Sequence, residues 1–96
     1  MNISELLKSK KNEILKLAEK YGAYNARIFG SVARGEADEK SDVDFLVEFK
    51  PGVGLISWSG LWLELEDLLG RKVDVITEKA LKSRIKEKVL REARPV

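Results

Sequence analysis

The sequence predicts an α+β fold (α/β-like), in which a small β-sheet is covered by helices on one face. Three long stretches place apolar residues at three- and four-residue intervals, which is the period of an amphipathic helix. Shorter stretches between them alternate apolar and polar residues, as strands with one buried face do. Glycine and proline separate the stretches, so strands and helices mix along the chain.

The first long helix is expected over residues 3–21. Asn2 or Ser4 can serve as its N-cap, and Gly22 follows its last turn. Its buried stripe is predicted to consist of Leu7, Ile14, Ala18 and Tyr21. A strand is expected next, over residues 24–29.

A turn, a short helix, a polar loop and a second strand follow. Gly30 and Ser31 form the turn, and the short helix after them is expected to stop at Gly35. The strand over residues 42–49 has the clearest alternation in the chain. One of its faces carries Val43, Phe45, Val47 and Phe49, and the other carries Asp42, Asp44, Leu46 and Glu48.

The second half of the chain predicts one more strand between two helices. A helix over residues 57–69 is expected to end at Gly70, and a strand over residues 72–77 follows it. The two valines of this strand share one face, so that Asp74 lies on the opposite one. The last helix is expected over residues 79–93, with a row formed by Leu81, Ile85 and Val89.

The composition limits the chemistry that this chain can perform. Its 96 residues correspond to one domain, residues 1–96, and the net charge of +2 does not by itself indicate a nucleic-acid protein. The lack of cysteine and histidine excludes disulfides, thiolate nucleophiles, zinc fingers and a Ser-His-Asp triad. Metal chemistry must therefore use oxygen ligands, which favour Mg²⁺, Mn²⁺ or Ca²⁺. Without a membrane-length apolar run or a signal-like N-terminus, the protein is expected to be cytoplasmic, with no membrane partner.

Asp42 and Asp44 are candidate metal ligands. Residues two apart on a strand point to the same side, and at a dielectric constant near 20 their repulsion is on the order of 2.5 kcal/mol. If the strand that carries Asp74 is a neighbour, three carboxylates converge and a divalent cation such as Mg²⁺ would offset the repulsion. The alternative is a solvated sheet face, on which the aspartates bind no metal. Basic side chains that could pair with them are Arg34, Lys40 and Lys72.

The Gly30-Ser31 turn is a candidate phosphate site. Backbone N–H groups at a strand-to-helix junction are unpaired, and the helix dipole adds partial positive charge. The Ser31 hydroxyl can donate to a phosphate oxygen, and Arg34 lies one turn further on. The alternative is that Ser31 only caps the helix. A phosphate turn followed by paired aspartates and a third carboxylate is what a nucleoside triphosphate site requires.

These residues resemble the signature of the minimal nucleotidyltransferases, a compact branch of the DNA polymerase β superfamily. The matching positions are Gly30, Ser31, Ala33, Arg34, Gly35, Ser41, Asp42, Asp44 and Asp74. The resemblance covers nearly the whole chain, and it implies a small mixed sheet of the polymerase-β palm type. It further implies that the nucleotide is bound by Gly30, Ser31, Arg34, Gly35 and Ser41.

The resemblance also implies a reaction and a partner. Asp42 and Asp44 would hold Mg²⁺ and the nucleotide phosphates, and Asp74 would join a second metal ion and help to activate the attacking hydroxyl. Proteins of this family are commonly encoded with a HEPN-type ribonuclease toxin. The implied activity is therefore transfer of AMP from ATP to a tyrosine of that toxin, with this chain acting as the antitoxin.

Two other functions remain open from the sequence. The chain could neutralise a toxin by binding alone, or it could be a nucleotide-sensing or scaffold domain. The helix over residues 57–69 has more apolar circumference than one buried face requires, so Trp58 and Trp62 are either interface or core residues. The runs KSKK and KSRIKEK favour solvated helix faces over direct nucleic-acid contacts, because acidic residues are interspersed among them.

Overall fold

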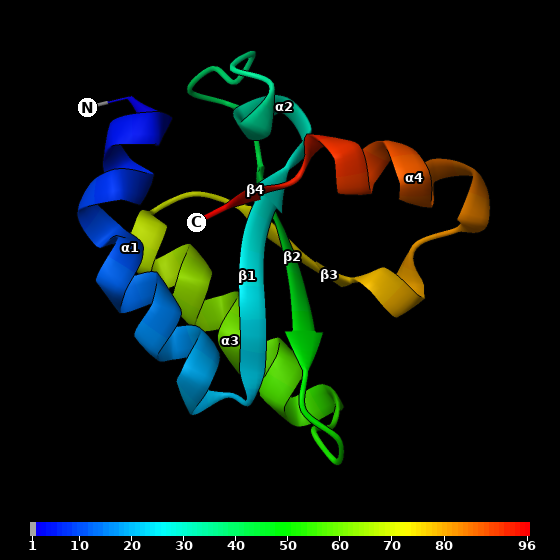
Figure 1. The fold of residues 1–96 in the computed structure, drawn as a ribbon. Helices are drawn as coiled ribbons and strands as arrows, with labels where there is room; N and C mark the ends of the chain where they lie inside the picture. Colours follow the sequence, from blue (N-terminus) through cyan, green and yellow to red (C-terminus); the bar gives the residue numbers. More distant parts are fainter. Residues whose placement is uncertain (1) are drawn as a thin grey trace.

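The computed structural model describes residues 2–96, and it contains a mixed four-stranded sheet with helices (Figure 1). The strands are β1 (Ala23–Phe29), β2 (Val43–Phe49), β3 (Val73–Thr77) and β4 (Arg94–Pro95), in the order β3-β2-β1-β4. β1 runs antiparallel to both β2 and β4, whereas β2 and β3 are parallel. The expected α+β class with a mixed sheet is thereby confirmed.

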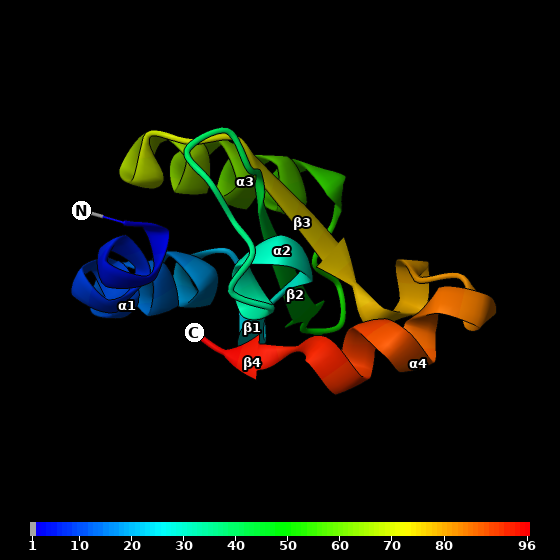
Figure 2. The same cartoon turned by 90° about the horizontal axis from the view of Figure 1, so that it is seen from above.

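The helices lie on both sides of the sheet (Figure 2). They are α1 (Ile3–Lys20), α2 (Gly30–Ala33), α3 (Leu55–Leu69) and α4 (Ser83–Glu92), with a 3₁₀ turn η1 (Glu78–Ala80) before α4. α1 and α3 lie side by side on one face, and α4 lies on the other (Figures 1 and 2). None of the helices within residues 2–96 has the length and apolar character needed to cross a membrane.

The ends of the long helices follow the cap residues in the sequence. Asn2 caps α1, because its Oδ1 atom accepts a hydrogen bond from the backbone N–H of Glu5 at 2.9 Å. Gly70 ends α3 in the left-handed conformation, with φ of 64°, and its N–H donates to Glu66 O at 2.8 Å. α3 begins at Leu55, two residues before the predicted start.

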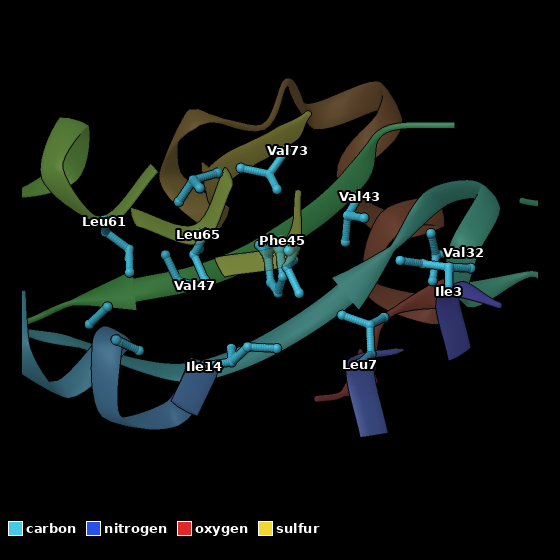
Figure 3. Close-up of a cluster of buried hydrophobic side chains, with 14 residues drawn as sticks. Ile3, Leu7, Ile14, Val32, Val43, Phe45, Val47, Leu61, Leu65 and Val73 are labelled. Carbon is cyan, nitrogen blue, oxygen red and sulfur yellow. The ribbon is translucent and has the colours of Figure 1, made fainter. Parts of the chain in front are cut away.

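The main core fills the space between β2 and the α1/α3 pair (Figure 3). Val43, Phe45 and Val47 on β2 are almost completely buried, as their alternation predicted. They pack with apolar side chains of both helices, including Ile14 and Leu65. Each fully buried side chain of this size contributes about 1.5–3 kcal/mol, so this face of β2 is held firmly and its other residues point the opposite way.

A second, smaller core contradicts the expectation that helices cover only one face. Leu46 points away from the main core yet is completely buried, and it packs with Phe29 and with Val89 of α4. Leu46 is the apolar exception among the polar residues on its side of β2. α4 therefore covers the middle of the second face, and the aspartates lie beyond it along the strand.

The predicted helix over residues 79–93 was wrong in its first part. Thr77 caps the 3₁₀ turn, because its Oγ1 atom accepts from the N–H of Ala80 at 3.3 Å. Leu81 is then extended, and α4 starts only at Ser83. Val89 is buried as expected, but Ile85 is 43% exposed, so the predicted row does not form a continuous buried stripe.

β1 and β4 form an irregular edge of the sheet. The pairing of β1 with β2 slips between Tyr24 and Arg27, and Asn25 within this bulge has φ of 51°. Beyond β1, the two-residue strand β4 pairs with it only at the end near α4, and the N–H of Val96 donates to Ala26 O at 3.3 Å.

Candidate active site

The fold brings Asp44 and Asp74 next to each other. They are partners in the parallel register of β2 and β3, and such partners point to the same face of a sheet. Asp42 lies two residues before Asp44, but it precedes the first residue of β2 and is exposed. The expectation that the strand with Asp74 is a neighbour of β2 is therefore confirmed.

The three aspartates do not form a ready-made metal cluster. No group of three acidic, histidine or cysteine side chains within residues 2–96 is arranged to hold a metal ion. Asp44 and Asp74 are fixed by strand pairing, whereas Asp42 lies outside the strand and is not held by the pleat. The donor set nevertheless fits Mg²⁺, because all three side chains offer the hard oxygen ligands that this ion prefers.

Asp44 is the most perturbed carboxylate at the site. Its burial, together with the nearby charges of Asp74 and Asp42, raises the pKa of its carboxyl to about 6. The Arg34 guanidinium acts on this pKa in the opposite direction, because its positive charge favours the ionised form of Asp44. Among the residues that the structure describes, none of the three aspartates has an ion pair, so the predicted pairing with a basic side chain is not found.

Gly30 brings the backbone turn against Asp44. It has φ of 71°, a conformation that favours glycine. A Cβ atom at this position would overlap Asp44 Oδ2 and would lie 3.3 Å from Asp44 Cγ. The turn and the carboxylate are therefore in direct contact, as a phosphate cradle beside a metal-binding carboxylate requires.

Ser31 does not cap the short helix α2. The N-cap position is Phe29, which makes no side-chain capping hydrogen bond, and Ser31 lies within the helix. The turn is instead closed by backbone bonds, such as Glu36 N to Ser31 O at 2.9 Å. The alternative reading of Ser31 as an N-cap is thus wrong.

The other predicted nucleotide-binding residues shape the loops around this turn. Gly35 ends α2 with φ of 74° and has open space around it. Ser41 closes the loop before β2, since its Oγ atom accepts from Asp38 N at 3.0 Å and donates to Asp38 Oδ1 at 3.1 Å. Arg34 makes ion pairs with Glu36 and Glu92, both at 3.1 Å.

Sequence reasoning missed two residues that support the site. Arg71 Nη2 donates to Asp38 O at 2.5 Å and to Ser41 O at 2.9 Å, which anchors the loop that leads to Asp42. Glu92 pairs with Arg34 from the end of α4. Neither contact has a local signal in the sequence, because each joins segments that are far apart along the chain.

The two tryptophans of α3 are half-buried and pack against the main core. Trp58 Nε1 also donates to Val75 O at 2.8 Å. The exposed apolar side chains of α3 are instead those of Leu55, Ile56 and Leu63, which are 76%, 90% and 65% exposed.

Known relatives show the family of this chain. The model of a family described as "Nucleotidyltransferase domain" matches residues 9–96. A protein assigned as a protein adenylyltransferase in Methanocaldococcus jannaschii is 43% identical, over 97% of this chain and 96% of its own length. The protein adenylyltransferase MntA of Thermococcus cleftensis is also 43% identical, over 94% of this chain and 88% of its own length.

Comparison with solved structures also points to a nucleotidyltransferase. One assigned to a minimal nucleotidyltransferase is 48% identical, with a TM-score of 0.87 over 96% of this chain and 94% of that chain. Two more distant structures share the fold. One is a toxin–antitoxin crystal structure with AMP-PNP (TM-score 0.75, 22% identity, 88% of this chain and 70% of that chain). The other contains a tri-AMPylated Shewanella oneidensis HEPN toxin with its MNT antitoxin (TM-score 0.68, 19% identity, 92% of this chain and 69% of that chain). The chain thus belongs to the nucleotidyltransferase-domain family and is an enzyme of its minimal nucleotidyltransferase branch.

Proposed function

We propose that this chain is a Mg²⁺-dependent protein adenylyltransferase, which transfers AMP from ATP to a tyrosine hydroxyl of a HEPN-type toxin and thereby acts as its antitoxin. The observation that carries the proposal is that Asp44 contacts the Gly30 turn and is also the register partner of Asp74. The relatives named protein adenylyltransferase support AMP as the transferred group and a protein as the acceptor. The toxin–antitoxin complexes with the same fold support the choice of partner.

The proposed reaction forms a bond between the acceptor oxygen and the α-phosphorus of ATP, and pyrophosphate leaves with the electrons of the broken bond. Asp42, Asp44 and Asp74 would hold two Mg²⁺ ions, which neutralise charge on the phosphates when bound. The Asp74 carboxylate accepts the proton of the attacking hydroxyl. The amides at Gly30 and Ser31 hold phosphate oxygens beside these carboxylates.

The remaining predicted residues have supporting parts in this proposal. Arg34 binds a phosphate through its guanidinium, for which its position near Asp44 is suitable. Gly35 allows the tight end of α2, and Ser41 holds the loop before Asp42 in place. Their effect on the nucleotide is through the shape of the two loops that border it.

Incubation of the purified chain with its toxin, Mg²⁺ and ATP labelled at the α-phosphate is expected to label the toxin. ATP labelled at the γ-phosphate should give no labelled toxin, because that phosphate leaves with pyrophosphate, and EDTA should stop the transfer. Replacing the modified tyrosine of the toxin by phenylalanine should remove the label. A stable complex that protects against the toxin but never becomes labelled would instead support neutralisation by binding alone.

We expect the exposed apolar residues of α3 to contact the toxin. Ile56→Asp should weaken the complex by at least about tenfold, because an apolar contact at an interface centre is replaced by a charge that must be desolvated. Its melting temperature should stay close to that of the wild type, since Ile56 is 90% exposed. Ile85→Asp on α4, on the other side of the sheet, is the control, because it makes the same change at an exposed position. Equal affinities of all three proteins in a calorimetric titration would contradict this docking site.

A further inference from the structure

The side chain of Arg34 is held by two carboxylates of unequal exposure. Its Nε atom donates to Glu36 Oε1 and its Nη1 atom donates to Glu92 Oε2, both at 3.1 Å. The side chain of Glu36 is 63% exposed, whereas that of Glu92 is 19% exposed. Exposed ion pairs are weak because water screens them and the side chains stay mobile. Glu92 is therefore the partner that fixes the position of the guanidinium.

The third nitrogen of Arg34 is left for a ligand. Within residues 2–96, no hydrogen bond or ion pair engages Arg34 Nη2. A guanidinium binds phosphate best along an edge that presents two N–H donors, and Nε and Nη2 form such an edge. A phosphate that displaces the exposed Glu36 can take this edge while Glu92 keeps its bond to Nη1.

The place of Glu92 in the fold is unfavourable without Arg34. It is the last residue of α4, where the negative end of the helix dipole disfavours a carboxylate. The last carbonyls of the helix are already capped by Arg94 Nη1, which donates to Arg91 O at 3.0 Å and to Glu92 O at 3.2 Å. The Glu92 carboxylate can only accept hydrogen bonds, and it accepts one from Arg34, 58 residues earlier in the chain.

We propose that Glu92 is a positioning residue, which orients Arg34 for the nucleotide phosphates without touching the nucleotide. This inference rests on the proposed function, in which Arg34 binds a phosphate. Val89, one turn before Glu92, is buried against Phe29 and Leu46, so the carboxylate is carried by a helix anchored on the sheet. The last helix, α4, therefore supplies a carboxylate that holds Arg34 beside the phosphate-binding turn, although the two segments are far apart in the sequence.

A double-mutant cycle tests this role by calorimetric titration with Mg²⁺ and AMP-PNP. Arg34→Ala is expected to weaken binding by about tenfold, and Glu92→Gln by about fivefold. The variant that carries both changes should bind no more weakly than Arg34→Ala, because Glu92 acts only through Arg34. Glu36→Gln is the matched control, and its affinity should stay within about twofold of the wild type. Melting temperatures measured in parallel show that each variant is folded.

The outcomes separate this inference from the proposed function. Wild-type affinity in Glu92→Gln would overturn the positioning role, and so would a fivefold loss that persists in the Arg34→Ala background. A loss in Glu36→Gln as large as in Glu92→Gln would show that any carboxylate near Arg34 has the same effect, which also overturns it. If the wild-type chain does not bind AMP-PNP with Mg²⁺, the proposed function itself fails. If Arg34→Ala binds normally, only the phosphate role of Arg34 and the inference built on it fail.

Discussion

Asp44→Asn is expected to abolish nucleotidyl transfer and also to make the metal-free protein more stable at neutral pH. The amide has nearly the shape of the carboxylate but lacks its charge, so it cannot replace it as a ligand for Mg²⁺. Loss of one such ligand should lower the transfer rate by about 10³-fold or more, which corresponds to about 4 kcal/mol. Label transfer from α-labelled ATP measures this loss, and residual activity near that of the wild type would contradict the assignment of Asp44.

The stability gain follows from the ionisation of Asp44. The pKa of this carboxyl is about 6 in the folded chain, against an ordinary value of 3.8 for an aspartate. Well below pH 3.8 the group is protonated in both the folded and the unfolded state, so its ionisation has no effect on stability. As the pH rises towards 6 the unfolded state loses the proton first, and the wild type loses stability that it does not regain above that pH.

The size of this effect can be measured in thermal melts. A shift of two pKa units is worth at most about 3 kcal/mol, and the partial exposure of Asp44 reduces this to about 1–2 kcal/mol. In EDTA at pH 7.5, Asp44→Asn should therefore melt about 5 °C or more above the wild type, and the difference should vanish at about pH 3. Asp42→Asn, at an exposed position, is the control and should show a much smaller gain. An equal gain at both pH values would point to packing and not to ionisation.

Gly30→Ala is expected to lower activity far more than Gly35→Ala, although both substitutions strain the backbone. The two glycines have φ of 71° and 74°, so an alanine at either position costs about 1–3 kcal/mol. Only at Gly30 would the added methyl group overlap the Asp44 carboxylate, whereas Gly35 has open space around it. Displacement of a reacting group by about 1 Å can cost about 10²-fold, so the Gly30 variant should lose at least that factor.

Transfer rates and melting temperatures of the two glycine variants decide this prediction. The difference in activity should persist when both are assayed well below their melting temperatures. The Gly30 variant should also bind Mg²⁺ with AMP-PNP less tightly, since its methyl group moves both the turn and the carboxylate. Equal loss of activity in both variants would mean that backbone strain alone explains it, and that contact with Asp44 is irrelevant.

Local patterns in the sequence predicted the elements of the site, but not everything that holds them together. The alternation of residues 42–49 is sufficient to orient Asp44 away from the main core, because neighbouring residues on a strand face opposite ways. The pairing of Asp44 with Asp74 was only a conditional expectation. It depends on strand order, which periodicity does not encode, and the resemblance to a known family supplied what the pattern lacked.

Contacts between distant segments account for most of what the sequence did not predict. Leu46 looked like an exception on a polar face, and only the return of α4 across the sheet explains why it is apolar. The Arg34–Glu92 pair joins residues in unrelated local patterns. The tryptophans of α3 were ambiguous because a helix with apolar residues around its circumference does not indicate which of them meet the sheet.

The short strand at the edge of the sheet affects how copies of this protein meet one another. An open strand edge is a template for further strands and so for aggregation. Here Pro95 has no N–H to offer, and the N–H of Val96 is already donated to Ala26 O. The bulge around Asn25 disrupts the regular spacing of the neighbouring stretch of β1. The edge of the sheet formed by β4 and β1 therefore resists the addition of strands from other copies, although no helix covers it within residues 2–96.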